Sequence, residues 1–277
     1  MKLQEVVAWC VPIIEEYAPM TVRQLYYQLV VRGHIPNNRN AYCAFDRHLT
    51  TAREKGLIDA ASFVDRSRTA RDVIRPGYSS LRSFLNVVRR AYSRDPLGGQ
   101  PEKVEVWIEK DALSQIVADV LAEWRPTIIV TRGYSPFTLL HEARERLCTS
   151  RATILYFGDF DPSGLDIDRD IAEKLGHVST ERIALTEAQI AEYSLVPQIT
   201  KDGDSRQAKF VERYGDAAYE LDALPPDVFR AIVREAFLGL IDEEQVRLVA
   251  EREEAEVQQL REMLDSLEEQ LEGDGDS

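Results

Sequence analysis

The chain has 277 residues, of which 44% are hydrophobic and 30% charged, so it is long enough for two modest domains or one large one. Its formal net charge of −14, taken as a bulk number, argues against a protein that covers nucleic acid with surplus basic side chains. The charge is uneven, however. Residues 1–100 carry 15 basic and 9 acidic side chains, whereas residues 241–277 carry 3 and 14, so the two ends call for separate interpretations.

The cysteines and the apolar segments exclude several classes of protein. Cys10, Cys43 and Cys148 lie far apart with no CxxC pair, which argues against a zinc site or a disulfide framework. No apolar run approaches the roughly 20 residues of a membrane span, and the N-terminus lacks the features of a signal peptide. We therefore expect a soluble, cytoplasmic protein with reduced thiols and no membrane partner.

Residues 1–94 predict a mostly helical DNA-binding domain. Thr21 suits the N-cap of a helix that ends near Gly33, and a second, basic helix follows and ends at Gly56. Residues 57–68 read as a short strand pair or wing, so that the whole describes a winged helix-turn-helix. A further helix lies within 75–95, and residues 95–102 form a linker rich in proline and glycine.

Residues 103–240 predict an α/β domain. Four strands, KVEVWIE, TIIVTRG, ATILYFGDFD and ERIAL, alternate with helices of about a dozen residues. This alternation indicates a Rossmann-like parallel sheet with helices on both faces. YELDAL is a possible further strand, and PPDVFRAIVREAFLGL a helix.

Residues 241–277 predict an acidic amphipathic helix with a frayed end. Its apolar residues form a short heptad-like seam of Val257, Leu260, Leu264, Leu267 and Leu271. The seam is too short for an independent coiled coil, so we expect it to pack against the body or a partner subunit.

Three carboxylates stand at the carboxyl ends of predicted strands. Glu109 follows the first strand, and Asp159 and Asp161 end the third. If these two strands are neighbours, the carboxylates converge and need a cation to offset their repulsion. Oxygen-only ligands favour Mg²⁺ or Mn²⁺, which could stabilise charge on a phosphodiester oxygen. The alternative is that DxD forms a turn and a helix cap, with Glu109 at the surface.

WIEKDAL, followed some fifty residues later by YFGDFDPSG, resembles a Toprim domain, the metal-binding fold of topoisomerases, primases and some nucleases. The resemblance covers about 104–176, and residues 186–240 are similar to the downstream part of bacterial and phage Toprim proteins. It implies that Glu109, Asp159 and Asp161 hold the metal. Four further acids are either second-shell groups of this site or solvated and structural residues: Asp166, Asp168, Glu220 and Asp222.

TVRQLYYQL resembles the segment that carries the nucleophilic tyrosine in the A subunit of topoisomerase VI and its meiotic relatives. The resemblance implies a homodimer in which Tyr27 attacks DNA, with Arg23 one helical turn away to favour the phenolate. Tyr26 fits the apolar face better, which leaves Tyr27 nearer the polar side. The chain has no P-loop, so a strand-passing machine would need a separate ATPase subunit. Alternatively, both tyrosines are core residues.

The basic residues of the first domain supply candidate contacts to DNA phosphates. They are Arg39, Arg47, His48, Arg53 and Lys55 around the second helix, and Arg66, Arg68 and Arg71 in the wing. The leading hypothesis is metal-dependent DNA cleavage by tyrosine transesterification. The alternatives are a Toprim nuclease that hydrolyses DNA with water, similar to the nuclease subunit of plasmid-defence systems, and a non-catalytic DNA-binding or assembly module.

Overall fold

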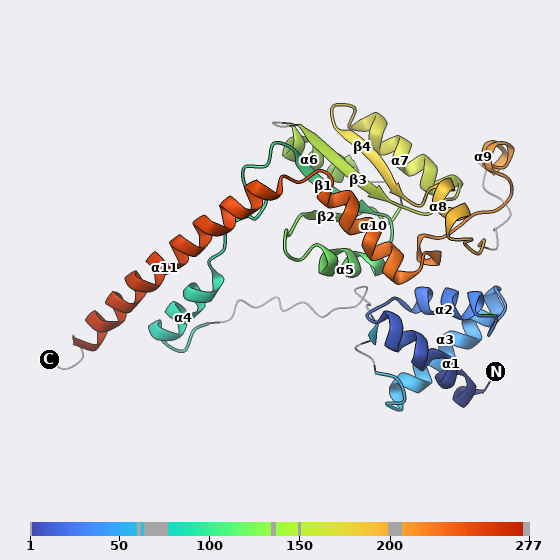
Figure 1. Cartoon of the computed structure of the whole chain (residues 1–277), viewed down its shortest axis with the longest axis horizontal. Coiled ribbons are helices and arrows are strands. Elements are labelled where there is room, and N and C mark those ends of the chain that lie inside the picture. The colour runs from blue at the N-terminus through green and yellow to red at the C-terminus, as the bar shows by residue number, and fades with distance from the viewer. Residues whose placement is uncertain are drawn as a thin grey trace. The chain divides into compact units, whose positions relative to one another are not determined.

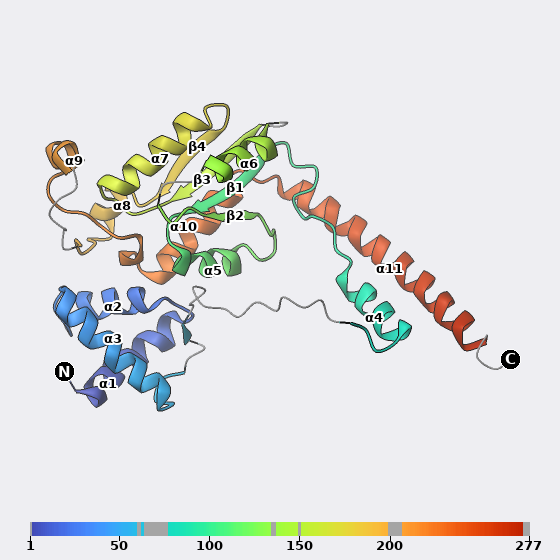
Figure 2. The same cartoon turned by 180° about the vertical axis from the view of Figure 1, so that it is seen from behind.

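The computed structural model describes residues 2–59, 62–63, 77–133, 137–148, 151–198 and 207–273, without the side chains of 137–138, 207–209 and 268–273. The chain forms two compact units, drawn in Figures 1 and 2. The first combines Met1–Arg68, Glu102–Ala122 and Pro126–Leu240. The second combines Thr69–Pro101, Glu123–Arg125 and Ile241–Ser277. The helical N-terminus and the α/β part therefore belong to one unit.

Three helices open the first unit: α1 (Leu3–Tyr17), α2 (Val22–Val31) and α3 (Arg39–Glu54). As predicted, Thr21 caps α2: its side chain accepts a hydrogen bond from Gln24 N, and the Gln24 side chain accepts one from Thr21 N. Asn38 caps the basic helix α3 with a single bond, in which its side chain accepts from Ala41 N. Apolar side chains of the three helices form a small core, in which Cys10, Leu25 and Phe45 are fully buried.

The segment predicted as a wing is described only in part. Met20 and Phe63 form an isolated parallel β-bridge, and the Arg53 guanidinium lies over the Phe63 ring. Arg66, Arg68 and Arg71 lie outside the described residues. The winged-helix interpretation thus stays a prediction.

The α/β part contains the four predicted strands. They are β1 (Lys103–Ile108), β2 (Thr127–Val130), β3 (Ala152–Phe157) and β4 (Ser179–Ala184). All pairings are parallel and the strand order is β2-β1-β3-β4, so the first and third strands are neighbours. The expectation of a parallel, Rossmann-like α/β sheet is confirmed.

Helices cover both faces of this sheet, as Figure 1 shows. They are α5 (Asp111–Val120), α6 (Phe137–Leu147), α7 (Pro162–Lys174) and α10 (Pro226–Leu238). On one face, Trp107, Ile154 and Tyr156 pack in one core with buried residues of α6 and α7. On the other face the Phe157 ring meets Phe229 of α10 edge to face, at 6.1 Å between centroids. A sheet buried on both sides accounts for the unbroken apolar run of β3.

The chain between β4 and α10 forms short elements. They are α8 (Glu187–Glu192), α9 (Gln207–Tyr214) and the 3-10 helix η2 (Leu221–Ala223). The prediction of a strand at YELDAL was wrong: Ala218 and Tyr219 make single β-bridges and η2 follows at once. Pro225 and Pro226 come directly after this segment, and proline cannot donate to a ladder.

The second unit contains α4 (Leu81–Ala91) and the 31-residue helix α11 (Glu243–Gly273). They run antiparallel, because Arg94 N donates to Glu253 while Arg89, earlier in the chain, pairs with Asp265. The helix that the sequence placed in the N-terminal domain therefore packs with the acidic helix instead. No helix in the described ranges is both long and apolar enough to cross a membrane. All three cysteines are free.

Candidate functional site

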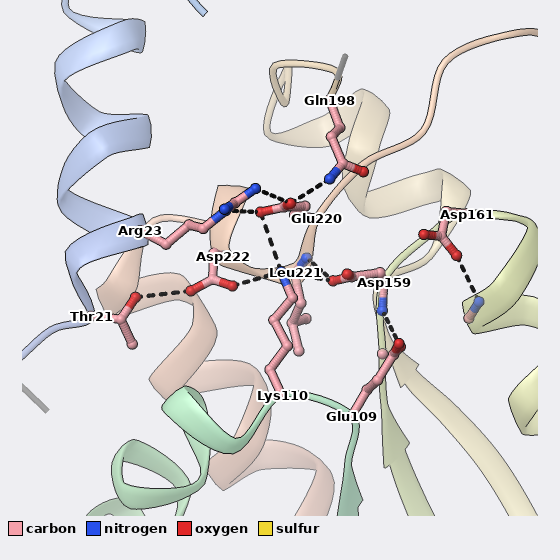
Figure 3. Close-up of polar contacts among 12 residues, drawn as sticks. Thr21, Arg23, Glu109, Lys110, Asp159, Asp161, Gln198, Glu220, Leu221 and Asp222 are labelled. Carbon is pink, nitrogen blue, oxygen red and sulfur yellow. Dashed lines mark hydrogen bonds and ion pairs between the residues drawn. The ribbon is translucent and has the colours of Figure 1, made fainter. Parts of the chain in front are cut away.

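Glu109 and Asp159 lie side by side at the carboxyl ends of β1 and β3. Glu109 N donates to the carbonyl of Phe157 at 2.9 Å, which continues the β1–β3 ladder to the end of both strands. Asp159 N then donates to the Glu109 carboxylate, at 3.2 Å from Oε2 (Figure 3). Strand pairing alone thus brings together two residues that are fifty positions apart, as the sequence predicted.

Asp161 is engaged differently. It is the N-cap of α7, and its Oδ1 accepts a hydrogen bond from Gly164 N at 2.7 Å. Pro162 occupies the first turn of that helix, and Gly164 packs so closely that a Cβ there would lie 2.2 Å from the carbonyl oxygen of Asp159. The turn-and-cap reading of DxD therefore holds for its second aspartate.

Burial and nearby negative charge raise the pKa values of the carboxylates at the strand ends. Burial, then the negative charge of Asp159, raises the pKa of Glu109 to about 7. Burial also raises the pKa of Asp159 to about 6, although the Lys110 ammonium and the Leu221 N–H both favour its charged form. The two groups thus form an acidic edge that a nearby positive charge would stabilise.

Lys110 is the positive charge that the structure places there. Its Nζ lies 3.2 Å from Asp159 Oδ1, 3.3 Å from Glu220 Oε2 and 2.7 Å from Asp222 Oδ2. These three carboxylates raise its pKa well above the usual range, against the opposing effect of burial. Lys110 belongs to the WIEKDAL segment, but the sequence does not indicate these partners, because Glu220 and Asp222 are more than a hundred residues away.

Glu220 and Asp222 also join the helical N-terminus to the sheet edge. Both are buried. Arg23 of α2 pairs with Glu220 through two nitrogens, and Thr21 Oγ1 donates to Asp222 at 2.8 Å. Figure 3 shows these contacts meeting around Lys110. The alternative that Glu220 and Asp222 are solvated surface residues is thus wrong, because their carboxylates are held by Arg23, Lys110 and Thr21.

Asp166 and Asp168 lie on α7, away from the Lys110 cluster. Asp166 pairs with Arg169 on the exposed side of the helix. Asp168 accepts from Arg182 Nε at 2.5 Å. Arg182 then donates to four main-chain carbonyl oxygens around the β3–α7 loop, those of Gly158, Asp159, Gly164 and Leu185, at 2.7–3.3 Å. This largely buried guanidinium fixes the loop that carries Asp159 and Asp161.

Tyr27 is 2% exposed. The sequence placed it nearer the polar side of its helix, but the structure buries it. Burial raises its pKa, and the negative charge of Glu220 opposes the help of Arg23 and Lys110. Its phenol ring contacts Tyr26 edge to face at 5.6 Å. Arg23 lies one turn away as predicted, but its guanidinium is taken up by Glu220. The hydroxyl of Tyr26 is hydrogen-bonded to the turn at residues 36–38, where it accepts from Asn38 N.

The candidate DNA contacts that the structure describes lie on or next to α3. Arg39, Arg47 and Lys55 are exposed, whereas His48 and Arg53 are half-buried. Arg47 Nε donates only to the carbonyl of Cys43, within its own helix. These side chains are therefore available to phosphate, and no described acid neutralises Arg39, Arg47 or Lys55 in an ion pair.

The donors at the strand ends fit a hard divalent cation in kind but are few in number. They are carboxylate oxygens, which are the ligands that such cations prefer. Within the described ranges, no three acidic, histidine or cysteine side chains gather closely enough to hold a metal. Two carboxylates are, however, the number that Mg²⁺ commonly takes from protein when substrate phosphates and water complete its shell.

Residues 85–222 match the model of a family described as "Protein of unknown function C-terminus (DUF2399)". The matched region runs from α4 to Asp222 and includes Glu109, Lys110, Asp159 and Glu220. The chain is thus similar to this family over the sheet and its acidic edge, but not over α2. No curated protein matches the chain.

Proposed function

We propose that the protein cleaves DNA phosphodiester bonds with the help of Mg²⁺ or Mn²⁺ at the edge formed by Glu109 and Asp159. One observation carries the proposal: the half-buried carboxylate of Glu109 and the buried carboxylate of Asp159, both with raised pKa, meet at the carboxyl ends of adjacent parallel strands. In open α/β sheets this is where ligands bind. The strand order and the placement of the acids also support a Toprim-type fold for this part of the chain.

Glu109 and Asp159 would hold the cation, and Asp161 would stay with its helix cap. When bound, the cation supplies Lewis-acid stabilisation of charge on the phosphodiester oxygens and lowers the pKa of an attacking water. Lys110 keeps Asp159 ionised and offsets the charge of Glu220 and Asp222 behind it. Arg182 fixes the main chain of the loop, so that the carboxylates need no rearrangement when phosphate arrives.

The DNA strand is expected to contact the basic side of α3 through phosphate. Arg39, Arg47 and Lys55 are exposed there, and such contacts give affinity without sequence preference. In this proposal the N-terminal helices form a winged helix and supply the surface that binds duplex DNA. A homodimer and a separate ATPase subunit, which the topoisomerase resemblance implies, are further parts of the proposal that the cleavage chemistry itself does not require.

Water is the nucleophile that the geometry favours. Tyr27 is buried, its pKa is raised, and the arginine that should activate it is paired with Glu220. Transesterification by Tyr27 is the second candidate, because the charges of Arg23 and Lys110 both act on its hydroxyl and favour its phenolate. That reaction would leave Tyr27 covalently bound to a 5′ phosphate end.

The test is cleavage of supercoiled plasmid by the purified chain with Mg²⁺ or Mn²⁺, stopped with detergent and analysed with and without protease. We expect free DNA ends that persist in Tyr27→Phe and a rate at least about 100-fold lower in Glu109→Gln, the equivalent of a few kcal/mol of transition-state stabilisation. Protein-linked ends that vanish in Tyr27→Phe would establish the second candidate. Absence of cleavage with either metal would contradict both.

A further inference from the structure

The strand next to β1 ends with a basic residue beside the candidate site. Beyond the last residue of β2, Thr131 N donates to the carbonyl of Ile108 at 2.9 Å. Arg132 N then donates to the carbonyl of Glu109 at 3.2 Å, so the β1–β2 ladder continues as far as Arg132. Because neighbouring strands are about 4.8 Å apart, the main chain of Arg132 lies one strand spacing from that of Glu109.

The main chain at this position has a conformation that arginine rarely adopts. Arg132 has a φ of +48°, in the left-handed region, and Gly133 follows with a φ of +101°. A residue with a Cβ is unfavourable there, whereas glycine is not. The turn at the end of β2 therefore does not account for an arginine, and such backbone outliers cluster at active sites and ligand clamps.

Asp111 holds the guanidinium of Arg132 at the start of α5. Arg132 Nη2 lies 2.6 Å from Oδ2 of Asp111, which is the first residue of α5 and the second after Glu109. Among the residues that the structure describes, Asp111 is the one partner of this guanidinium in an ion pair or hydrogen bond. A guanidinium has five N–H donors, so most of them remain available to a ligand.

Three other cations lie around this edge, and protein groups already engage each of them. Lys110 lies among three carboxylates, and the guanidinium of Arg23 is paired with a buried glutamate of the same cluster (Figure 3). Arg182 is taken up by an aspartate of α7 and by main-chain carbonyls. These three side chains are 20%, 39% and 13% exposed, against 70% for Arg132. Arg132 is thus the most accessible of the four.

We propose that Arg132 binds a DNA phosphate next to the one that is cleaved, while Asp111 steadies its guanidinium beside the strand ends. This role rests on the proposed function, because Glu109 and Asp159 define where the cleaved phosphate would lie. Successive phosphates of a strand are one nucleotide apart, a rise of about 3.4 Å, so a neighbouring phosphate comes within reach of the end of β2. A guanidinium can bind phosphate with two parallel N–H bonds, which adds affinity and fixes the position of the DNA strand.

The test is the binding of labelled duplex DNA by the full chain, followed by fluorescence anisotropy at several salt concentrations. Ca²⁺, which takes oxygen ligands, is present, and no cleavage is needed. We expect Arg132→Ala to weaken binding about 10-fold and to reduce the slope of log K against log [salt] by about 0.9, the value for one phosphate. Arg132→Lys should keep the slope but lose part of the affinity, because lysine cannot make the two parallel bonds.

Two comparisons distinguish a phosphate contact from other effects. Arg151→Ala is the matched control, because Arg151 is also exposed and paired with one acid, Glu102, but precedes β3 at the opposite end of the sheet. It should leave the affinity and the slope unchanged. Arg132→Gly relieves the left-handed backbone, so it should unfold at no lower temperature than the wild type and yet bind DNA as weakly as Arg132→Ala.

Equal affinities and slopes for the wild type, Arg132→Ala and Arg151→Ala would overturn the role of Arg132, and so would a wild-type chain that does not bind the duplex. Plasmid cleavage tells the two proposals apart. If Arg132→Ala cleaves with the same KM as the wild type, the proposed function stands and the contact at Arg132 is refuted. If the chain never cleaves but Arg132→Ala still binds DNA more weakly, the phosphate contact stands and the proposed cleavage is refuted.

Discussion

Lys110 shows at the residue scale how much of the site depends on one largely buried charge. Its ammonium lies within ion-pair distance of three carboxylates. Two of these, Glu220 and Asp222, are also held by side chains of Arg23, Thr21 and Gln198. A buried charge that loses its partner costs more than the pair contributes, because the remaining ion has neither water nor a counter-charge. The cluster should thus be the most sensitive part of the first unit to substitution.

Lys110→Met is expected to lower the free energy of unfolding by about 3–5 kcal/mol at pH 7, because it leaves Asp159, Glu220 and Asp222 facing one another. Urea unfolding measures the loss. Adding Asp222→Asn should recover part of it by removing one of the unpaired charges. The control is Lys174→Met, whose exposed pair with Asp170 should be worth less than about 1 kcal/mol. Equal losses in Lys110→Met and Lys174→Met would refute the buried cluster.

Glu109 should make stability depend on pH. Because burial and Asp159 raise its folded-state pKa from 4.5 to about 7, its contribution to stability is fully present below pH 4.5 and is lost as the pH rises through 7. Glu109→Gln, which cannot ionise, should therefore be more stable than the wild type at pH 8, by up to about 3 kcal/mol.

That advantage should shrink to nearly zero toward pH 4.5. Urea unfolding with a chelator present, at pH 5 and pH 8, measures it. A difference between Glu109→Gln and the wild type that stays constant with pH would show that the raised pKa is absent.

Arg182 is expected to act through the loop that it holds, without touching the substrate. Arg182→Lys keeps the charge but loses most of the bonds to the carbonyls of Gly158, Asp159, Gly164 and Leu185. Cleavage should fall about 10–100-fold, as for groups that orient metal ligands. The fall should reside in kcat, with KM for DNA unchanged. Arg169→Lys, on the exposed side of α7, is the control and should retain full activity.

At the scale of elements, the strands and most helices could be predicted because their apolar patterns and caps are local. Helices α2, α3 and α7 each begin after a residue type that favours the N-cap, namely Thr21, Asn38 and Asp161. Each of the strands β1 to β4 follows a turn or loop. What could not be predicted depends on contacts distant in sequence. YELDAL has the composition of a strand, yet it forms η2 because Leu221 N bonds to Asp159 and Glu220 faces Lys110. Nor does the sequence indicate that α4 pairs with α11.

The β3–α7 turn allows a prediction about a single methyl group. Gly164→Ala should lower the free energy of unfolding by about 1–3 kcal/mol, because the added Cβ would lie 2.2 Å from the carbonyl oxygen of Asp159. Gly176→Ala, whose Cβ would be no closer than 3.7 Å to its neighbours, is the matched control and should have little effect. Thermal unfolding distinguishes them. Equal midpoints for the two variants would mean that the turn is looser than described.

At the scale of the whole molecule, the net charge of −14 divides among structures with different roles. The exposed bases of α3 are candidates for phosphate, and part of the acid in the α/β domain surrounds Lys110. The acid of α11 partly neutralises arginines of the second unit, through Arg89 with Asp265 and Arg94 with Glu256. An acidic chain can therefore still carry a basic surface on one of its helices.

The proposed function rests on the binding of a divalent cation by Glu109 and Asp159 together. Titration of the full chain with Mn²⁺, followed by electron paramagnetic resonance of the free ion, tests it most directly. We expect one ion per chain, bound at least about 10-fold more weakly by Glu109→Gln. Glu187→Gln, which changes an exposed acid at the start of α8, should bind the ion with unchanged affinity. Wild-type and Glu109→Gln chains that bind Mn²⁺ equally, or a wild-type chain that binds none, would contradict it.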